Sequence, residues 1–413
     1  RPDHMTIVTI ERLGQQGDGV AQGPLFVPLS LPGEVVSGTV DGDILTDIRI
    51  EKPSDDRVAA PCPHFKACGG CQVQHASDAF VAQWKRDIVE TALVIQGVET
   101  DVRPTLTSPD RSRRRATFAA RRTKKGAMVG FHARKSDASI PVPSCILVTP
   151  ALAAVPPMAE SLAIAGASRK GSLSVTVTES LEGLDVAVTG GKPLDGTLRI
   201  ALAAQCERFR LARLTWDDEV IGMREPPAQT MGRARIVPPP GAFLQATAHG
   251  QTVLCDLVAD AVAPAKSIAD LFAGCGTFAL PLARDAEIIA VEGAPDMIAA
   301  LDAGWRQTQG LKRITAVARD LFRRPLLPDE LAPFDAVVID PPRAGAAAQV
   351  SELAQARVPR IAHVSCNPQT FARDAKTLCD AGYVLEWVQP VDQFRWSSHV
   401  ELVGAFRLNH MRD

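Results

Sequence analysis

Residues 266–283 have the sequence KSIADLFAGCGTFALPLA, and this stretch decides the fold class. Its first seven residues predict a buried strand, its two glycines a tight turn, and the residues from Thr277 onward the start of a helix. A second strand-like run, Ile288–Val291, follows the predicted helix. Strands that alternate with helices are typical of a doubly wound sheet. We therefore predict a Rossmann-like α/β domain over residues 236–413.

Three successive strands of this domain end in or near a carboxylate. Asp270, Glu292 and Asp320 occupy these positions. Open α/β sheets bind ligands at the carboxyl ends of their strands, and a carboxylate about twenty residues after a glycine turn can hold a ribose. The chain lacks the G-x-G-x-x-G fingerprint of dinucleotide sites, since it reads G-C-G-T-F from Gly274. The pattern favours S-adenosylmethionine over a dinucleotide, with Gly274 and Gly276 allowing close approach to the backbone.

Two later strands lead into candidate reactive groups. The fourth strand ends in D-P-P-R-A-G, whose prolines fix where Asp340 and Arg343 point, so that a carboxylate can meet a base edge and a guanidinium a phosphate. The run Arg360–Val364 then leads into S-C-N-P, which places Cys366 on a turn at a strand end. A thiol there is either a nucleophile or an ordinary buried cysteine. Near the C-terminus, Glu401 lies close to a histidine at a strand start and is a candidate general base.

A group of cysteines in the first third of the chain indicates a metal site. Cys62, Cys68 and Cys71 form C-x5-C-x2-C, and Gly69-Gly70 lets the backbone fold tightly between the last two. Cys145, flanked by prolines and a serine, is the best placed fourth ligand. This set suits a structural zinc ion or an iron–sulfur cluster, and its spacing does not choose between them.

A basic segment follows the cysteines. Residues 111–125 contain eight Lys or Arg residues and no acidic residue, and Lys124-Lys125-Gly126 predicts the turn of a hairpin. Such a hairpin either cradles the phosphates of a nucleic acid or is a solvated face. We predict RNA contacts from the following cations: Arg113, Arg114, Arg115, Arg121, Arg122, Lys124 and Arg343.

Composition and patterning set the domain organisation of the 413 residues. Short alternating runs with glycine-rich turns over residues 5–55 predict a small antiparallel β-barrel. Residues 56–235 predict a central α+β domain that carries the cysteines and the basic hairpin. No apolar run is long enough for a membrane span and no signal-peptide pattern is present, so we expect a cytoplasmic protein. The net charge of −2 excludes nothing, because a polyanion needs only a local basic patch.

Five of these features together closely resemble the RNA 5-methyluridine methyltransferases. They are C-x5-C-G-G-C with a later cysteine, D-L-F-A-G-C-G-T-F, D-P-P-R-A-G, S-C-N-P and H-V-E, in the order of that family and spanning nearly the whole chain. The N-terminal barrel is similar to the family's RNA-binding TRAM module. The branch of the family that acts on 23S ribosomal RNA has the four-cysteine site, whereas the branch that acts on the tRNA T-loop generally lacks it.

The resemblance implies a [4Fe–4S] cluster on the four cysteines and a covalent mechanism at a uridine. Carbon 5 of uracil is too weak a nucleophile to take a methyl group from a sulfonium unaided. Addition of the Cys366 thiolate to carbon 6 gives an enolate that is electron-rich at carbon 5. Glu401 would then remove the carbon 5 proton so that the thiolate can leave. The uridine must swing out of its helix or loop to reach the thiol.

The resemblance also assigns residues to the cofactor. Gln245, Glu292 and Asp320 match family contacts to S-adenosylmethionine, and Asp340 matches a residue near the target uracil. One departure concerns Thr247, since the family usually has asparagine there, so a cofactor contact at this position is not implied.

Three other classes of protein fit the chain less well. An enzyme that methylates amino groups normally has an aromatic residue after the two prolines, where this chain has Arg343. A 5-methylcytosine enzyme needs a cysteine in residues 340–345, which contain none. A non-enzymatic RNA-binding protein would not need Cys366 together with Glu401. We therefore predict a monomeric enzyme that methylates uridine in 23S rRNA, with tRNA as the alternative substrate.

Overall fold

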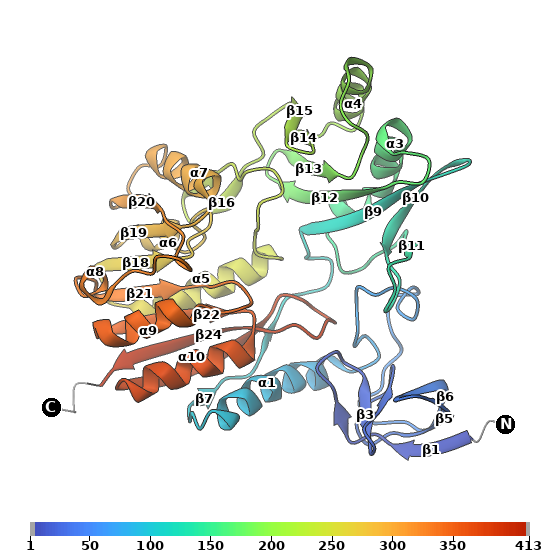
Figure 1. The fold of residues 1–413 in the computed structure, drawn as a ribbon, viewed down its shortest axis with the longest axis horizontal. Helices are drawn as coiled ribbons and strands as arrows, with labels where there is room; N and C mark the ends of the chain where they lie inside the picture. Colours follow the sequence, from blue (N-terminus) through green and yellow to red (C-terminus); the bar gives the residue numbers. More distant parts are fainter. Residues whose placement is uncertain (1–4, 410–413) are drawn as a thin grey trace.

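The computed structural model describes residues 5–409, which form three layered regions around separate sheets (Figure 1). The N-terminal region is a six-stranded sheet in the order β1-β5-β6-β4-β3-β2, with Val27, Val36 and Leu45 in its core. Its neighbours pair antiparallel except β4 and β6, which pair parallel at one position. Closure of this sheet into a barrel stays a prediction. The strands are β1 (Met5–Thr9), β2 (Arg12–Leu13), β3 (Gly19–Ala21), β4 (Leu25–Val27), β5 (Val35–Asp41) and β6 (Ile44–Lys52).

The central region is a seven-stranded sheet with helices packed on one core. Its strands run in the order β11-β10-β9-β12-β13-β14-β15, and the predicted basic hairpin is the antiparallel pair of β9 and β10. The elements are β9 (Arg115–Thr123), β10 (Gly126–His132), β11 (Ser139–Pro141), α2 (Pro150–Ala153), α3 (Pro156–Gly166), β12 (Ser172–Ser180), β13 (Gly183–Thr189), α4 (Gly196–Arg208), β14 (Arg213–Trp216) and β15 (Glu219–Met223).

The C-terminal region is built on a nine-stranded sheet in the order β20-β19-β18-β21-β22-β24-β23-β7, with β8 also paired to β23. The five strands from β20 to β22 are parallel, as the alternating pattern predicts, and β24 is antiparallel to both of its neighbours. The strands are β7 (Asp101–Val102), β8 (Leu106–Thr107), β18 (Ser267–Leu271), β19 (Glu287–Glu292), β20 (Ile314–Ala318), β21 (Ala336–Ile339), β22 (Arg360–Ser365), β23 (Tyr383–Asp392) and β24 (Glu401–Leu408).

Helices cover both faces of this sheet. One core includes residues of α1, α8, α9 and α10, and the other includes residues of α5, α6, α7 and the small hairpin of β16 and β17. The elements are α1 (Asp78–Ile95), β16 (Gln229–Met231), β17 (Ala234–Ile236), α5 (Ala248–Val262), α6 (Ala279–Leu282), α7 (Pro295–Arg306), α8 (Pro328–Leu331), α9 (Ala347–Ala356) and α10 (Pro368–Asp380). Within residues 5–409, no helix combines the length and the apolar character that a membrane span needs.

The helix predicted from Thr277 is shorter than the pattern indicates. The structure begins α6 at Ala279 and ends it at Leu282. Pro281 lies inside it, and proline has no N–H to extend the helical hydrogen bonds. A short turn therefore follows the glycine loop before β19 begins.

Segments from the first quarter of the chain complete the C-terminal sheet. Strand β7 pairs parallel with β23, and α1 packs beside α10 (Figure 1). The helix begins after Ser77, which caps it by accepting a hydrogen bond from the N–H of Phe80 at 3.2 Å. Hence α1, β7 and β8, which fall in the predicted central domain of residues 56–235, pack with the predicted domain of residues 236–413.

Candidate active site

The carboxyl ends of the parallel strands open into one cavity of about 570 Å³, which we call the strand-end cavity. Its wall is formed by the glycine turn, the ends of β19 and β20, the D-P-P-R loop and the turn after β22. The loop between β23 and β24 and the start of β24 complete it. Its lining includes these predicted residues: Gln245, Gly274, Glu292, Asp320, Asp340, Arg343, Cys366 and Glu401. The doubly wound topology thus brings together side chains that lie up to about 150 residues apart in sequence.

The glycine turn has the backbone geometry that its residues predict. Gly274 and Gly276 have φ angles of 57° and 97°, a region that favours glycine. A Cβ on Gly276 would lie 2.9 Å from side-chain atoms of both Leu280 and Leu301. Glu292 holds this turn, because one of its oxygens accepts a hydrogen bond from the N–H of Gly274 at 2.9 Å.

Asp270 lies beneath the turn and does not line the cavity. Its side chain is fully buried, and within the described residues neither of its carboxylate oxygens has a hydrogen-bond partner. Burial, followed by the nearby carboxylate of Asp340, raises the pKa of Asp270 well above its ordinary value. A cationic group in the cavity would therefore relieve an unfavourable accumulation of negative charge.

Phe272 and Phe322 line the cavity but were not predicted as site residues from the sequence. Phe272 follows β18 in the left-handed backbone region with φ of 61°, and its ring lies 5.3 Å from that of Phe322. The side chain of Phe322 is 54% exposed although it is large and apolar. An exposed ring beside a partly buried one at a cavity wall offers a face on which a flat ring can stack. The D-L-F sequence marks Phe272 as a strand end, but nothing local in it indicates the unusual φ.

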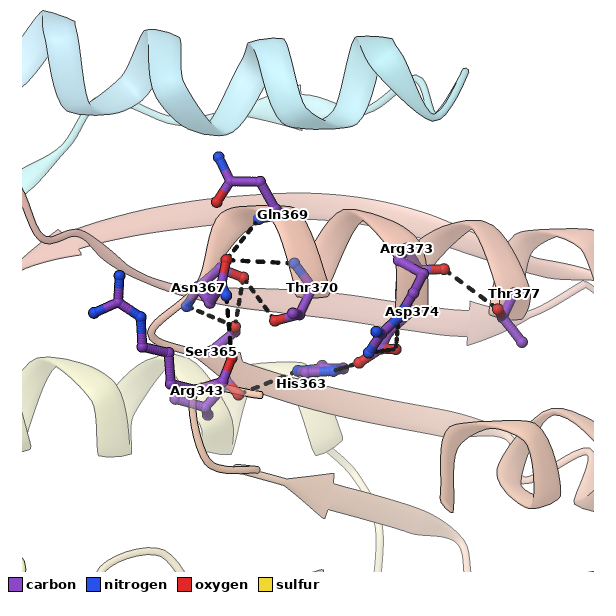
Figure 2. Close-up of polar contacts among 10 residues, drawn as sticks. Arg343, His363, Ser365, Asn367, Gln369, Thr370, Arg373, Asp374 and Thr377 are labelled. Carbon is purple, nitrogen blue, oxygen red and sulfur yellow. Dashed lines mark hydrogen bonds and ion pairs between the residues drawn. The ribbon is translucent and has the colours of Figure 1, made fainter. Parts of the chain in front are cut away.

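The turn that carries Cys366 is fixed by hydrogen bonds of Asn367 (Figure 2). The Asn367 side-chain oxygen accepts from the N–H groups of Gln369 at 3.0 Å and Thr370 at 3.4 Å, which caps α10. Its side-chain nitrogen donates to the carbonyl oxygen of Arg343 at 3.1 Å. One amide side chain therefore ties the Cys366 turn to the loop of Asp340 and Arg343.

A second cavity meets the first at Cys366. It measures about 460 Å³, and we call it the interdomain cavity because its wall includes Gln15 and Gln16 of the N-terminal region and Lys135 of the central region. Cys366 and His399 line both cavities. Burial and the nearby carboxylates of Glu401 and Asp340 raise the pKa of the Cys366 thiol.

Glu401 is a buried carboxyl at the start of β24. Burial, followed by the charge of Asp340, raises the pKa of Glu401 to about 8, and a hydrogen bond from Gln393 opposes this rise. Burial and Glu292 raise the pKa of Asp340 to about 7. Both groups therefore exchange protons in the range in which general bases operate.

The Thr247 side chain contacts α5 and Ser108 and does not line the strand-end cavity. Its hydroxyl accepts a hydrogen bond from the N–H of Gly250 at 2.8 Å, which caps α5, and lies 2.9 Å from the hydroxyl of Ser108. Thr247 is absent from the lining of the strand-end cavity, whereas Gln245, two residues earlier, is present.

The predicted RNA-binding cations lie in different environments. Arg114 is buried and donates to the carbonyl oxygen of Gln245 at 3.1 Å and to the side chain of Gln251 at 2.7 Å, so its guanidinium joins the central and C-terminal regions. Arg115 donates to the carbonyl oxygen of Gly241 at 3.0 Å. Arg113 is largely withdrawn from solvent, and burial lowers its pKa.

The tip of the basic hairpin lines neither of the cavities that meet at Cys366. Arg121 and Lys124 are exposed there, and Arg122 is half-buried. Figure 1 shows this tip projecting beside α3, away from the C-terminal sheet. Of the seven predicted cations, only Arg343 lines a cavity at Cys366.

The four predicted metal-ligating cysteines line one cavity of about 270 Å³, the cysteine cavity. Arg113 and Arg115 share its wall. No set of three or more His, Cys, Asp or Glu side chains in residues 5–409 is placed to hold a metal ion. The structure thus gathers Cys62, Cys68, Cys71 and Cys145 around a common space without closing them on a single point.

The cysteine segment also holds the loop before Glu401. The carbonyl oxygen of Trp396 accepts hydrogen bonds from the N–H groups of Gln72 at 2.7 Å and Val73 at 3.0 Å. The Trp396 side chain packs in a cluster with Cys62 and Cys71. Any group that orders the cysteines therefore stabilises the loop that leads to Glu401.

Known proteins that resemble this chain are RNA methyltransferases. A family model described as tRNA (Uracil-5-)-methyltransferase matches residues 237–407. An uncharacterized RNA methyltransferase of Rhizobium meliloti (strain 1021) is 44% identical over 407 residues, which cover 96% of this chain and 98% of the relative. The 23S rRNA (uracil(1939)-C(5))-methyltransferase RlmD of Shewanella sp. (strain MR-4) is 30% identical over 429 residues, which cover 97% of this chain and 95% of the relative.

Among solved structures, the Pyrococcus abyssi tRNA (uracil-54, C5)-methyltransferase in complex with S-adenosyl-L-homocysteine has the same fold. It matches with a TM-score of 0.76 at 22% identity, over 97% of this chain and 99% of that chain. The similarity of sequence over nearly the full length of the relatives, together with the cavity at the strand ends, shows that this chain belongs to the RNA uracil-5-methyltransferase family and is an S-adenosylmethionine-dependent RNA methyltransferase.

Proposed function

We propose that the enzyme methylates carbon 5 of a uridine in 23S rRNA, as a monomer, through a covalent bond between Cys366 and carbon 6. The observation that carries this proposal is that Cys366 and Glu401 line the same cavity as Gln245, Glu292 and Asp320. A nucleophile, a base and a methyl donor must all reach one pyrimidine ring, and a single cavity permits this.

Each of the reactive residues of the cavity has its own step in the proposed reaction. The Cys366 thiolate adds to carbon 6, and the displaced electron pair makes carbon 5 nucleophilic. S-adenosylmethionine supplies the electrophilic methyl group that carbon 5 takes up. The Glu401 carboxylate then removes the proton from carbon 5, the electron pair of that bond re-forms the double bond between carbons 5 and 6, and the sulfur leaves as thiolate. Asp340, at the adjacent strand end, faces the base as a hydrogen-bonding group.

The two cavities at Cys366 give the two substrates separate approaches. The strand-end cavity has the glycine turn and the aromatic pair for the methyl donor. The interdomain cavity is lined by Arg134, Lys135 and Arg343, which are cations suited to a phosphate backbone. A uridine that swings out of its stack into the interdomain cavity would present carbon 6 to the thiol at their junction.

Two features favour 23S rRNA over tRNA as the substrate. The relative from Shewanella carries the name of a 23S rRNA enzyme, and the four cysteines match the branch of the family that acts on rRNA. The tRNA alternative draws on the family model and on the archaeal structure. Mapping 5-methyluridine in cells that lack the protein decides between them. We expect one 23S rRNA position to lose its methyl group while the tRNA T-loop keeps its own. Loss confined to tRNA would overturn the rRNA assignment.

We propose further that the cysteine cavity holds a [4Fe–4S] cluster on Cys62, Cys68, Cys71 and Cys145. A cubane with four irons separates its ligand sulfurs more widely than one ion does, which agrees with cysteines that share a cavity without meeting at a point. Such a cluster with four thiolates is anionic. Within the described residues the Nε of Arg115 is buried without a hydrogen-bond partner, so a guanidinium donor is available beside it.

The anaerobically purified protein should accordingly be brown, with about four irons and four sulfides per chain. Cys71→Ser should lose most of this iron, because one ligand of four is removed. Cys206→Ser serves as the control, since Cys206 is buried in the core of the central region away from the cysteine cavity. A colourless protein with stoichiometric zinc, or equal iron in both variants, would contradict the proposal.

A further inference from the structure

Gln393 is a buried glutamine between the cofactor side and the reactive side of the strand-end cavity. It follows the last residue of β23 and is 2% exposed. Its side chain packs on the first turn of α5, where Gly250 leaves room for it. A Cβ on Gly250 would lie 2.6 Å from the Gln393 side-chain oxygen and 2.7 Å from its Cβ.

Both side-chain N–H groups of Gln393 donate hydrogen bonds. Its Nε2 donates to Oε1 of Gln245 at 2.6 Å and to Oε2 of Glu401. Its Oε1 accepts from the N–H of Thr247 at 3.4 Å. A primary amide has two N–H donors, so the group has no donor left for any other partner. The amide can therefore adopt one orientation only.

The ion pair of Lys85 and Asp392 fixes the backbone on which Gln393 stands. The two side chains are fully buried, and their charged atoms lie 2.7 Å apart. Lys85 also donates to the carbonyl oxygen of Phe394 at 3.2 Å. Residues on both sides of Gln393 are thus anchored to α1, so the glutamine does not depend on Glu401 for its position.

The surroundings of Glu401 otherwise oppose its ionisation. Asp340 at the end of β21, Cys366 after β22 and Asp392 at the end of β23 all face it, and each is negative when ionised. Each therefore favours the protonated carboxyl, which cannot accept a proton from carbon 5. Gln393 is the group whose hydrogen bond favours the carboxylate.

We propose that Gln393 is a positioning residue that holds Glu401 as an oriented, ionisable base for the last step of the reaction. The inference rests on the proposed role of Glu401. Gln245 shares the same donor group, so the base is also held in register with a residue of the cofactor side of the cavity.

The test is single-turnover methylation of substrate RNA by Gln393→Met across a pH series. Methionine has a similar length and no donor, so methyl transfer should proceed while proton removal slows. We expect a methylated protein–RNA adduct, stable in denaturing gels, to accumulate near neutral pH. Its release should slow by about 10- to 100-fold, the value of a hydrogen bond to a charged group, and recover as the pH rises. Gln83→Met is the control, because Gln83 is exposed on α1.

Gly250→Ala provides a second variant that leaves residue 393 as glutamine. Its methyl group would displace the same amide and would also meet the Thr247 hydroxyl at 2.9 Å, while alanine itself is favourable in a helix. It should shift the pH profile in the same direction as Gln393→Met. A profile identical to wild type in both variants would overturn the inference. Failure of the proposed function itself has a different outcome, in which wild-type protein forms no adduct and Glu401→Gln keeps full activity.

Discussion

Cys366→Ala should form no covalent complex with RNA that contains 5-fluorouridine and should lose methylation by at least about 10³-fold. Fluorine at carbon 5 cannot leave as a proton, so wild-type protein is trapped after methyl transfer and migrates as a larger band in denaturing gels. Alanine removes the one sulfur that, among residues 5–409, lines both cavities. The rate at which the wild-type adduct forms should also rise with pH, since the pKa of Cys366 is raised and the thiolate is the attacking species.

The matched control is Cys379→Ala. Cys379 lies near the end of α10 and lines neither cavity at Cys366, so its variant should be trapped as efficiently as wild type. Calorimetric binding of S-adenosylhomocysteine should be unchanged in both variants. Residual methylation by Cys366→Ala at the wild-type rate would exclude the covalent route.

Glu401→Gln should complete one methyl transfer and then stall, with turnover lower by about 10²- to 10⁴-fold. Glutamine fills the same space but cannot take the carbon 5 proton, so the thiolate cannot leave. With radiolabelled methyl donor and natural RNA, the label should appear in a band that resists denaturation. Glu287→Gln is the control, because Glu287 is exposed at the opposite end of the same sheet. Normal turnover by Glu401→Gln would assign the proton removal to another group.

The same variant should change how stability depends on pH. Glu401 has a pKa of about 8 in the folded protein, against about 4.3 in an unfolded chain. Between these values the unfolded chain releases its proton while the folded protein keeps it, so the free energy of unfolding falls as the pH rises. The glutamine side chain does not ionise in this pH range, so it adds no such dependence. The decrease in thermal midpoint between about pH 5 and pH 8 should therefore be smaller in Glu401→Gln than in wild type.

The strand ends of the C-terminal domain could be predicted because parallel strands leave a local signature. The buried run Arg360–Val364 and the proline after it place Cys366 on a turn, and the structure has β22 over Arg360–Ser365. Glu292 ends β19 as predicted. Each prediction needs only apolar runs, turn residues and the rule that such strands align at one edge.

The role of Gln393 and the burial of Arg114 could not be predicted in this way. Gln393 stands in a polar stretch of sequence. Its partners, Gln245 and Glu401, come together only because β23 pairs with β24 and α5, which follows Gln245, packs on both strands. Arg114 belongs to a dense run of cations, and charge density does not tell which guanidinium is covered by another domain. Both assignments depend on tertiary contacts between distant segments.

The anchoring on α1 of the loop that leads to Glu401 has a consequence for synthesis on the ribosome. Lys85 lies 309 residues before Phe394, the carbonyl of which it binds. At a synthesis rate of about 5 to 20 residues per second, roughly 15 to 60 s pass between the synthesis of α1 and that of the strand against which it packs. Throughout that interval Val89 and Leu93, which are buried in the finished protein, lack the cover that β23 provides. The nascent chain should therefore be a substrate for chaperones until its last strand emerges.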